Sequence, residues 1–155
     1  MTAVVAPSDL LHFEDFQPGQ TFAFGRYEVT KEEIIAFAQE FDPQPHHLDE
    51  EAGKRSLLGG LAASGWHVCA MAMRMFADGI ILKSANRGGL GADECRWMKP
   101  VKPGDMLRME VEVLETRAPK SLPRVGFVRF SCRIFNQREQ VALLNMTPIL
   151  ARRGA

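Results

Sequence analysis

Several stretches of the chain alternate apolar and polar side chains with the period of two that is typical of β-strands. In the second half of the chain they cover residues 91–98, 106–117, 125–135 and 140–151. The alternation is clearest in 106–117, where the apolar side chains from Leu107 to Val113 share one face of the expected strand. Residues 22–29 alternate less strictly and predict an earlier strand, in which Gly25 indicates a β-bulge.

Two other segments carry apolar residues at the spacing of a helix. Thr30 and Glu33 predict a capping box at the start of the first helix, which Pro43 ends. The second helix opens at Ser64 and runs to about Gly79. Its side chains are apolar on nearly every side, which predicts that this helix is buried. The apolar residues are Trp66, Val68, Cys69, Met71, Ala72, Met73, Met75 and Phe76.

The order of these elements predicts the fold. Strands that follow one another without intervening helices favour an antiparallel sheet, against which the apolar helix can be buried. We therefore expect an α+β fold in which a curved antiparallel sheet wraps around a central buried helix. The chain has 155 residues, a length typical of one domain, and we expect a leader segment at 1–12 and a single domain at 13–152.

Composition and charge exclude several classes of function. Basic and acidic residues number 19 each and form no basic run, so we expect neither nucleic acid nor a membrane surface as a partner. The longest apolar run, residues 68–73, is too short to span a membrane. The three cysteines have no paired spacing, which argues against a zinc site or a disulfide framework and favours the cytoplasm.

The segment between the two predicted helices resembles a known family signature. Residues 41–49 are similar to the motif of MaoC-like proteins and (R)-specific enoyl-CoA hydratases, which is roughly D-x-N-P-x-H. Asp42, Pro45 and His47 match its aspartate, proline and histidine. Gln44 takes the place of its asparagine, which is a departure from the pattern.

Two later segments extend the resemblance over residues 13–150. Ala-Ser-Gly-Trp at 63–66 is similar to the start of the family's central helix, although Ser64 stands where hydratases often have histidine. Lys-Pro-Val-Lys-Pro-Gly-Asp at 99–105 resembles a turn that joins two strands of the family. The resemblance implies a hot-dog fold, which is the same α+β arrangement that the alternation of strands and helices predicts.

The resemblance also implies a reaction, the hydration of enoyl thioesters or the dehydration of 3-hydroxyacyl thioesters. An Asp/His pair can supply the acid and the base that this reaction needs. The family pattern assigns these roles to Asp42 and His47 together, and two prolines suit a rigid loop that holds both near one water. It also places the thioester carbonyl near Gly65, whose backbone N–H at a helix N-terminus is a suitable oxyanion donor.

The same resemblance suggests the partners of the protein. Its substrate would be an acyl thioester of coenzyme A or of acyl carrier protein, with no other cofactor and no metal. We expect a homodimer or higher homo-oligomer with sites at the interface, where Arg87, Arg96 or Lys99 would meet phosphates. The residues expected to bind the substrate are Gln44, Pro45, His46, Ser64 and Trp66.

Each candidate residue also has a simpler interpretation. Asp42 can pair with a group after its helix while His47 lies on the surface, and Gly65 can serve only close packing. Ser64 can cap its helix. His67 is typical of a hydrogen-bonded histidine in a core, and Trp66 and Trp97 fit either the core or the acyl pocket.

Two other functions remain open. A hot-dog acyl-CoA thioesterase would aim a carboxylate or histidine at the carbonyl carbon, whereas the Asp42–His47 motif favours the hydratase. A non-catalytic acyl-thioester-binding protein also stays possible, because Gln44 and Ser64 depart from the hydratase pattern.

Overall fold

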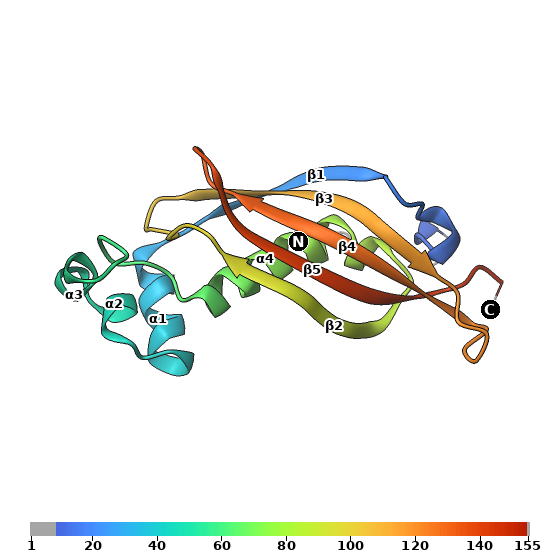
Figure 1. Ribbon diagram of the computed structural model, residues 1–155, viewed down its shortest axis with the longest axis horizontal. Helices are drawn as coiled ribbons and strands as arrows, with labels where there is room; N and C mark the ends of the chain where they lie inside the picture. The colour runs from blue at the N-terminus through green and yellow to red at the C-terminus, as the bar shows by residue number, and fades with distance from the viewer. Residues whose placement is uncertain (1–8, 155) are drawn as a thin grey trace.

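Residues 9–154 are described by a computed structural model, in which a five-stranded antiparallel sheet curves around one long helix (Figure 1). The order of strands across the sheet is β1-β3-β4-β5-β2. The strands are β1 (Thr21–Glu28), β2 (Asn86–Trp97), β3 (Met106–Arg117), β4 (Val125–Phe135) and β5 (Gln140–Ala151). The predicted α+β class and the antiparallel sheet around a helix are confirmed.

One long helix and several short ones complete the fold. The long helix α4 (Gly65–Gly79) lies against the concave face of the sheet, while α1, α2 and α3 gather beyond one end of it (Figure 1). The remaining helices are α1 (Lys31–Phe41), α2 (Pro45–Leu48), α3 (Glu50–Arg55) and the 3-10 turns η2 (Phe13–Asp15) and η3 (Ile81–Lys83). The predicted start and end of α4 are confirmed.

The strand predictions succeed where the alternation is strong. The bounds of β3, β4 and β5 match the predicted ranges, whereas β2 begins at Asn86 rather than at residue 91. Gly88 and Gly91 lie in β2 and carry no side chain, so no alternation marks this part of the strand. The predicted bulge is confirmed, since the pairing of β1 with β3 shifts between Phe24 and Tyr27.

The core forms between α4 and the sheet. Phe76 of α4 meets Phe130 of β4 edge-on, with ring centroids 5.2 Å apart, and Phe130 also meets Phe16 at 5.5 Å. The prediction that α4 is buried all round is wrong, because Trp66 is 62% exposed and Met73 41% exposed. The helix therefore has one face that no other part of residues 9–154 covers.

The predicted leader segment is described only in part. Its residues 1–8 lie outside the described range, so the limit between leader and domain stays a prediction. Leu11 donates its backbone N–H to the carbonyl oxygen of Lys83 and accepts from the N–H of Ala85. The end of the predicted leader thus contacts the domain. Within the described range, no helix is long and apolar enough to cross a membrane.

Candidate active site

The first helix places Asp42 at its C-terminal end. Thr30 Oγ1 accepts from the backbone N–H of Glu33 and so caps α1 as predicted. The other half of the capping box is wrong, because the carboxylate of Glu33 accepts from the hydroxyl of Tyr27 instead. The helix ends at Phe41, and Asp42 turns away from it with φ −152° and ψ 70°.

Two side chains donate hydrogen bonds to the carboxylate of Asp42. Ser64 Oγ donates to Oδ2 at 2.6 Å, and Gln44 Nε2 donates to Oδ1 at 2.8 Å. These two hydrogen bonds hold the pKa of Asp42 below its usual value, because they favour the charged form. The side chain is therefore an ionised hydrogen-bond acceptor at neutral pH.

His47 faces the same carboxylate from α2. Its Nδ1 lies 2.7 Å from the carbonyl oxygen of Ala62, which can only accept, so Nδ1 carries a hydrogen and donates it. The other ring nitrogen, Nε2, lies 3.5 Å from Oδ2 of Asp42. The simpler interpretation of a surface loop is wrong, because His47 is 6% exposed and belongs to a one-turn helix that Pro45 begins.

Ser64 lies beneath Asp42 and is fully buried. It precedes the first residue of α4, but its side chain makes no capping hydrogen bond. The capping interpretation is therefore wrong, since the hydroxyl is engaged by the carboxylate that lies 22 positions earlier in the chain. Gln44 and Ser64, expected to touch the substrate, both hold Asp42.

Gly65 is enclosed by an aromatic ring. A Cβ atom at this position would lie 2.4 Å from the indole of Trp97, so close packing of α4 on β2 requires glycine there. Trp97 also meets Trp66 edge-on, with ring centroids 5.1 Å apart. The packing interpretation of Gly65 thus has direct support, and its role as an oxyanion donor stays a prediction.

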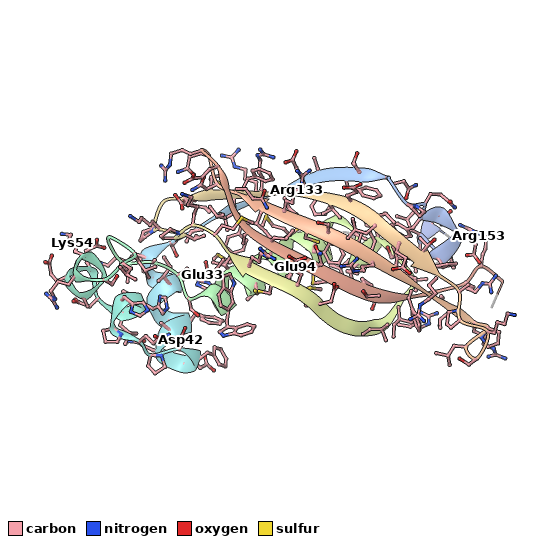
Figure 2. All side chains as sticks on the ribbon, in the orientation of Figure 1. Glu33, Asp42, Lys54, Glu94, Arg133 and Arg153 are labelled. Atoms are coloured by element: carbon pink, nitrogen blue, oxygen red, sulfur yellow. The ribbon has the colours of Figure 1, made fainter. Side chains whose placement is uncertain are left out.

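A cavity of about 460 Å³ opens at this end of the sheet. Figure 2 shows Asp42 among the helices beyond the sheet, far from Arg153 at the opposite end. Among the described residues, Pro45 and Ser64 are not part of its lining, and Lys99 is the one of the three predicted phosphate contacts that is. The predicted site residues in the lining are Asp42, Gln44, His46, His47, Gly65 and Trp66.

The sequence did not point to several apolar residues of this cavity. They are Leu57, Leu58, Val68, Met98, Val101 and Val141, which lie on four separate parts of the chain. The sequence did contain one signal, the pair Leu57–Leu58 before two glycines, because leucines in a glycine-containing loop lie outside the regular elements that form the core. In the structure Leu57 is fully exposed. Trp66 and Trp97 also line the cavity and are not core residues.

The two other histidines of this region differ in their surroundings. His46 stands edge-on to His47, with ring centroids 4.2 Å apart, and its pKa is lowered, first by burial and then by His47. His67 of α4 stacks on Phe37 of α1 and is buried, but its Nδ1 has no hydrogen-bond partner in the described part of the chain. The expectation of a hydrogen-bonded core histidine is therefore wrong for that nitrogen.

The side chains around Asp42 give no cluster suited to a metal. Within residues 9–154 no three His, Cys, Asp or Glu side chains come together as possible ligands. Asp49, which stands near the histidines in the sequence, accepts from the N–H of Ala52 and caps α3. The chemistry that the site offers is proton transfer and hydrogen bonding by Asp42 and His47.

Comparison with known proteins gives one matching family model, described as the MaoC like domain, over residues 15–125. A MaoC-like dehydratase from Rhodospirillum rubrum is 42% identical, with a TM-score of 0.86 over 94% of this chain and 99% of that one. An R-hydratase from Pseudomonas aeruginosa is 27% identical, with a TM-score of 0.71 over 92% of this chain and 86% of that one.

A third comparison concerns the fold alone. A conserved protein from Mycobacterium tuberculosis with a double hot-dog fold is 17% identical, with a TM-score of 0.81. The match covers 96% of this chain and 46% of that one, so this chain corresponds to one of two hot-dog units. The predicted hot-dog fold is confirmed.

Proposed function

This chain belongs to the MaoC-like domain family, and on that premise we propose that it hydrates enoyl thioesters and dehydrates 3-hydroxyacyl thioesters. The observation that carries the proposal is the arrangement of Asp42 and His47, whose Oδ2 and Nε2 lie 3.5 Å apart beside the cavity. Both atoms are hydrogen-bond acceptors when the imidazole is neutral, so neither satisfies the other. A water molecule on the cavity side of the pair has two hydrogens to donate and can bridge both atoms.

Asp42 and His47 have different roles in activating that water. Asp42 is a weak base, because Ser64 and Gln44 lower the pKa of its carboxyl group. We therefore assign the orientation of the water to Asp42 and the removal of its proton to Nε2 of His47. Nε2 can take up this proton, because Nδ1 carries the ring hydrogen and donates it to the carbonyl oxygen of Ala62.

The proton that His47 receives then completes the reaction. In hydration, the oxygen of the water bonds to the β-carbon and a proton bonds to the α-carbon of the thioester. The imidazolium formed in the first step is the acid that supplies this proton. In the reverse direction Nε2 removes the α-proton, the bond from the β-carbon to the hydroxyl group breaks, and the imidazolium gives the proton to the leaving hydroxide, which departs as water.

Negative charge on the thioester oxygen needs a donor at the other side of the cavity. The first N–H groups of a helix have no partner within the helix, and α4 begins at Gly65 in the cavity wall. We propose the backbone N–H of Gly65 as that donor. The apolar side chains Leu58, Val68 and Met98 would then surround the acyl group.

The handle of the substrate would lie at the mouth of the same cavity. Lys99 lines the cavity and is the candidate for a phosphate contact, whether the handle is coenzyme A or the arm of acyl carrier protein. Arg96 is less suited to that contact, because it already pairs with Glu94 at 2.8 Å. The chemistry proposed for Asp42 and His47 requires no additional cofactor.

We also propose that two copies of the chain form a homodimer through β2. In the described part of the sheet β2 pairs only with β5, and an unpaired strand edge favours the addition of another strand. Apolar side chains lie on this strand and on the uncovered face of α4, among them Leu90, at 55% exposure, and Met73.

The test of the function is an assay with crotonyl-CoA and a panel of longer and branched enoyl-CoAs. We expect loss of the ultraviolet absorbance of the conjugated double bond with the native protein and not with Asp42→Asn, which keeps the shape of the side chain. Release of free thiol instead would favour the thioesterase. Stoichiometric binding without any turnover would favour a non-catalytic binding protein.

A further inference from the structure

Two of the three cysteines face each other, Cys69 from α4 and Cys95 from β2. The Sγ atoms of Cys69 and Cys95 lie 3.6 Å apart, although the residues are 26 positions apart in the chain. Cys69 is half-buried and Cys95 is exposed, whereas the third cysteine, Cys132, is buried in β4. The pair is therefore accessible from solvent in the single chain, and Cys132 is not.

The neighbouring contacts explain why these two thiols meet. Trp66 and Trp97 touch edge-on, three residues before Cys69 on the helix and two residues after Cys95 on the strand. Residues three apart on a helix and two apart on a strand share a face, so each cysteine lies beside its own tryptophan. At Gly65 the indole of Trp97 lies directly against the first turn of α4.

We propose that Cys69 and Cys95 are a thiol-modification site that forms a reversible intramolecular disulfide. A disulfide bond is about 2.05 Å long, so the two sulfurs, which lie 3.6 Å apart, must approach by about 1.5 Å to form one. Neither thiol belongs to the proposed reaction, and the inference requires that Cys95, which lies on β2, stays accessible in the proposed homodimer.

The oxidant is a low-molecular-weight disulfide, and the exchange balances in two steps. The thiolate of one cysteine attacks a sulfur of the small disulfide, forms a mixed disulfide and releases one thiolate of the reagent. The thiolate of the other cysteine then attacks the protein sulfur of the mixed disulfide and releases the second reagent thiolate. Two protein thiols are oxidised, and one small disulfide is reduced to two thiols.

The rate of this exchange should rise with pH. Burial and the neighbouring Cys69 raise the pKa of Cys95 to about 11, so its thiolate is scarce at neutral pH. Closing the bond would fasten the first turns of α4 to β2 beside the cavity. A cross-link that closes a loop of this size stabilises the folded state, so the oxidised protein should melt at a higher temperature.

The test is incubation of the intact, folded protein with oxidised glutathione at pH 8.5, followed by intact-mass measurement and tryptic mapping without reduction. We expect the native protein to lose the mass of two hydrogens, with no glutathione adduct, and to regain it with dithiothreitol. The map should contain one cross-linked pair of peptides, residues 56–74 joined to residues 88–96, while residues 130–133 keep a free thiol.

Matched variants separate the disulfide from accidental reactivity. Cys69→Ser and Cys95→Ser should each lose the two-hydrogen change and accept at most one glutathione, and Cys132→Ser should behave as the native protein does. The proposal is overturned if the native protein stays unchanged under conditions that oxidise the unfolded chain, if it carries only glutathione adducts, or if the cross-link joins two copies.

Discussion

The imidazole of His47 is fixed by a 2.7 Å hydrogen bond from Nδ1 to the carbonyl oxygen of Ala62. That carbonyl precedes α4, so the segment that leads into the long helix determines which nitrogen of His47 is free. Nε2 is left as the acceptor, and it points at Asp42. The catalytic proposal rests on this single tautomer.

Asp42 and His47 are expected to act on one water, so the losses of activity caused by substituting each residue should not add. We predict that Asp42→Asn and His47→Gln each lower kcat by about 100- to 10,000-fold, the range typical of general acid–base groups. The double variant should be little worse than the worse single variant, because either change already disrupts the shared water. Steady-state kinetics of the three variants check this, and fully multiplied losses would contradict it.

Gln44 should control the protonation of Asp42. Its amide lowers the pKa of Asp42, so Gln44→Leu removes a donor to the charged form and raises that pKa. The carboxyl group of Asp42 should then take up its proton at a higher pH than in the native protein. The measurement is the pH titration of this carboxyl group by nuclear magnetic resonance, with Gln44→Asn as a control that restores the amide of the family motif.

Ser64 should stabilise the protein in a pH-dependent way. A hydrogen bond to a charged group is worth roughly 1.5–3 kcal/mol, so Ser64→Ala should lower the free energy of unfolding by about that amount at pH 7. The folded-state pKa of Asp42 is depressed, so this stabilisation is present above its unfolded pKa and is lost as pH falls through the folded pKa. Urea unfolding at several pH values measures it.

An Asp42→Asn background provides the control for that prediction. Without the charged acceptor, Ser64→Ala should cost less than it does in the native protein, since the two side chains share one hydrogen bond. An equal cost in both backgrounds, or a cost that does not change with pH, would assign the effect of Ser64 to packing alone.

Gly65 should tolerate no side chain while Trp97 is present. The Cβ of Gly65→Ala would lie 2.4 Å from the indole, so we expect a destabilisation of about 1–3 kcal/mol from overpacking. Combining it with Trp97→Ala should recover part of the loss, because the clash is removed. Thermal unfolding of the two single variants and the double variant tests this, and the absence of any coupling would argue against the close contact.

A charge on the free edge of β2 should oppose dimerisation. Leu90→Arg adds like charges to both copies of the proposed interface, whereas Leu122→Arg, at a similarly exposed leucine in the turn between β3 and β4, should have no effect. Light scattering at micromolar concentration should give a dimer for the native protein and for the Leu122 variant. A native monomer would exclude the interface.

Local patterns predicted most of the fold, because the alternation of a strand and the apolar spacing of a helix can both be recognised in consecutive residues. The bounds of β3 follow from its strict alternation. The patterns failed in two places. Gly88 has no side chain, so no alternation marks the start of β2. The apolar composition of α4 does not show that Trp66 and Met73 are exposed, because exposure depends on which other elements pack against the helix.

In the candidate site, too, the sequence predicted local features and missed contacts between distant segments. A motif within ten residues identified Asp42 and His47 as neighbours. The contact of Ser64 with Asp42 joins segments 22 positions apart, and that of Cys69 with Cys95 joins a helix to a strand. Neither spacing has a local signature, so only the folded chain brings these side chains together.

Because α1, α2 and α3 lie beyond the end of the sheet, the stability of the candidate site can differ from the stability of the sheet (Figure 1). These helices carry Asp42 and His47, and they meet α4 and its leading segment through Ser64 and the carbonyl of Ala62. Protein segments can open locally at a lower free energy than the global one. In the proposed enzyme, local opening of these helices on warming would therefore abolish activity while the sheet is still folded.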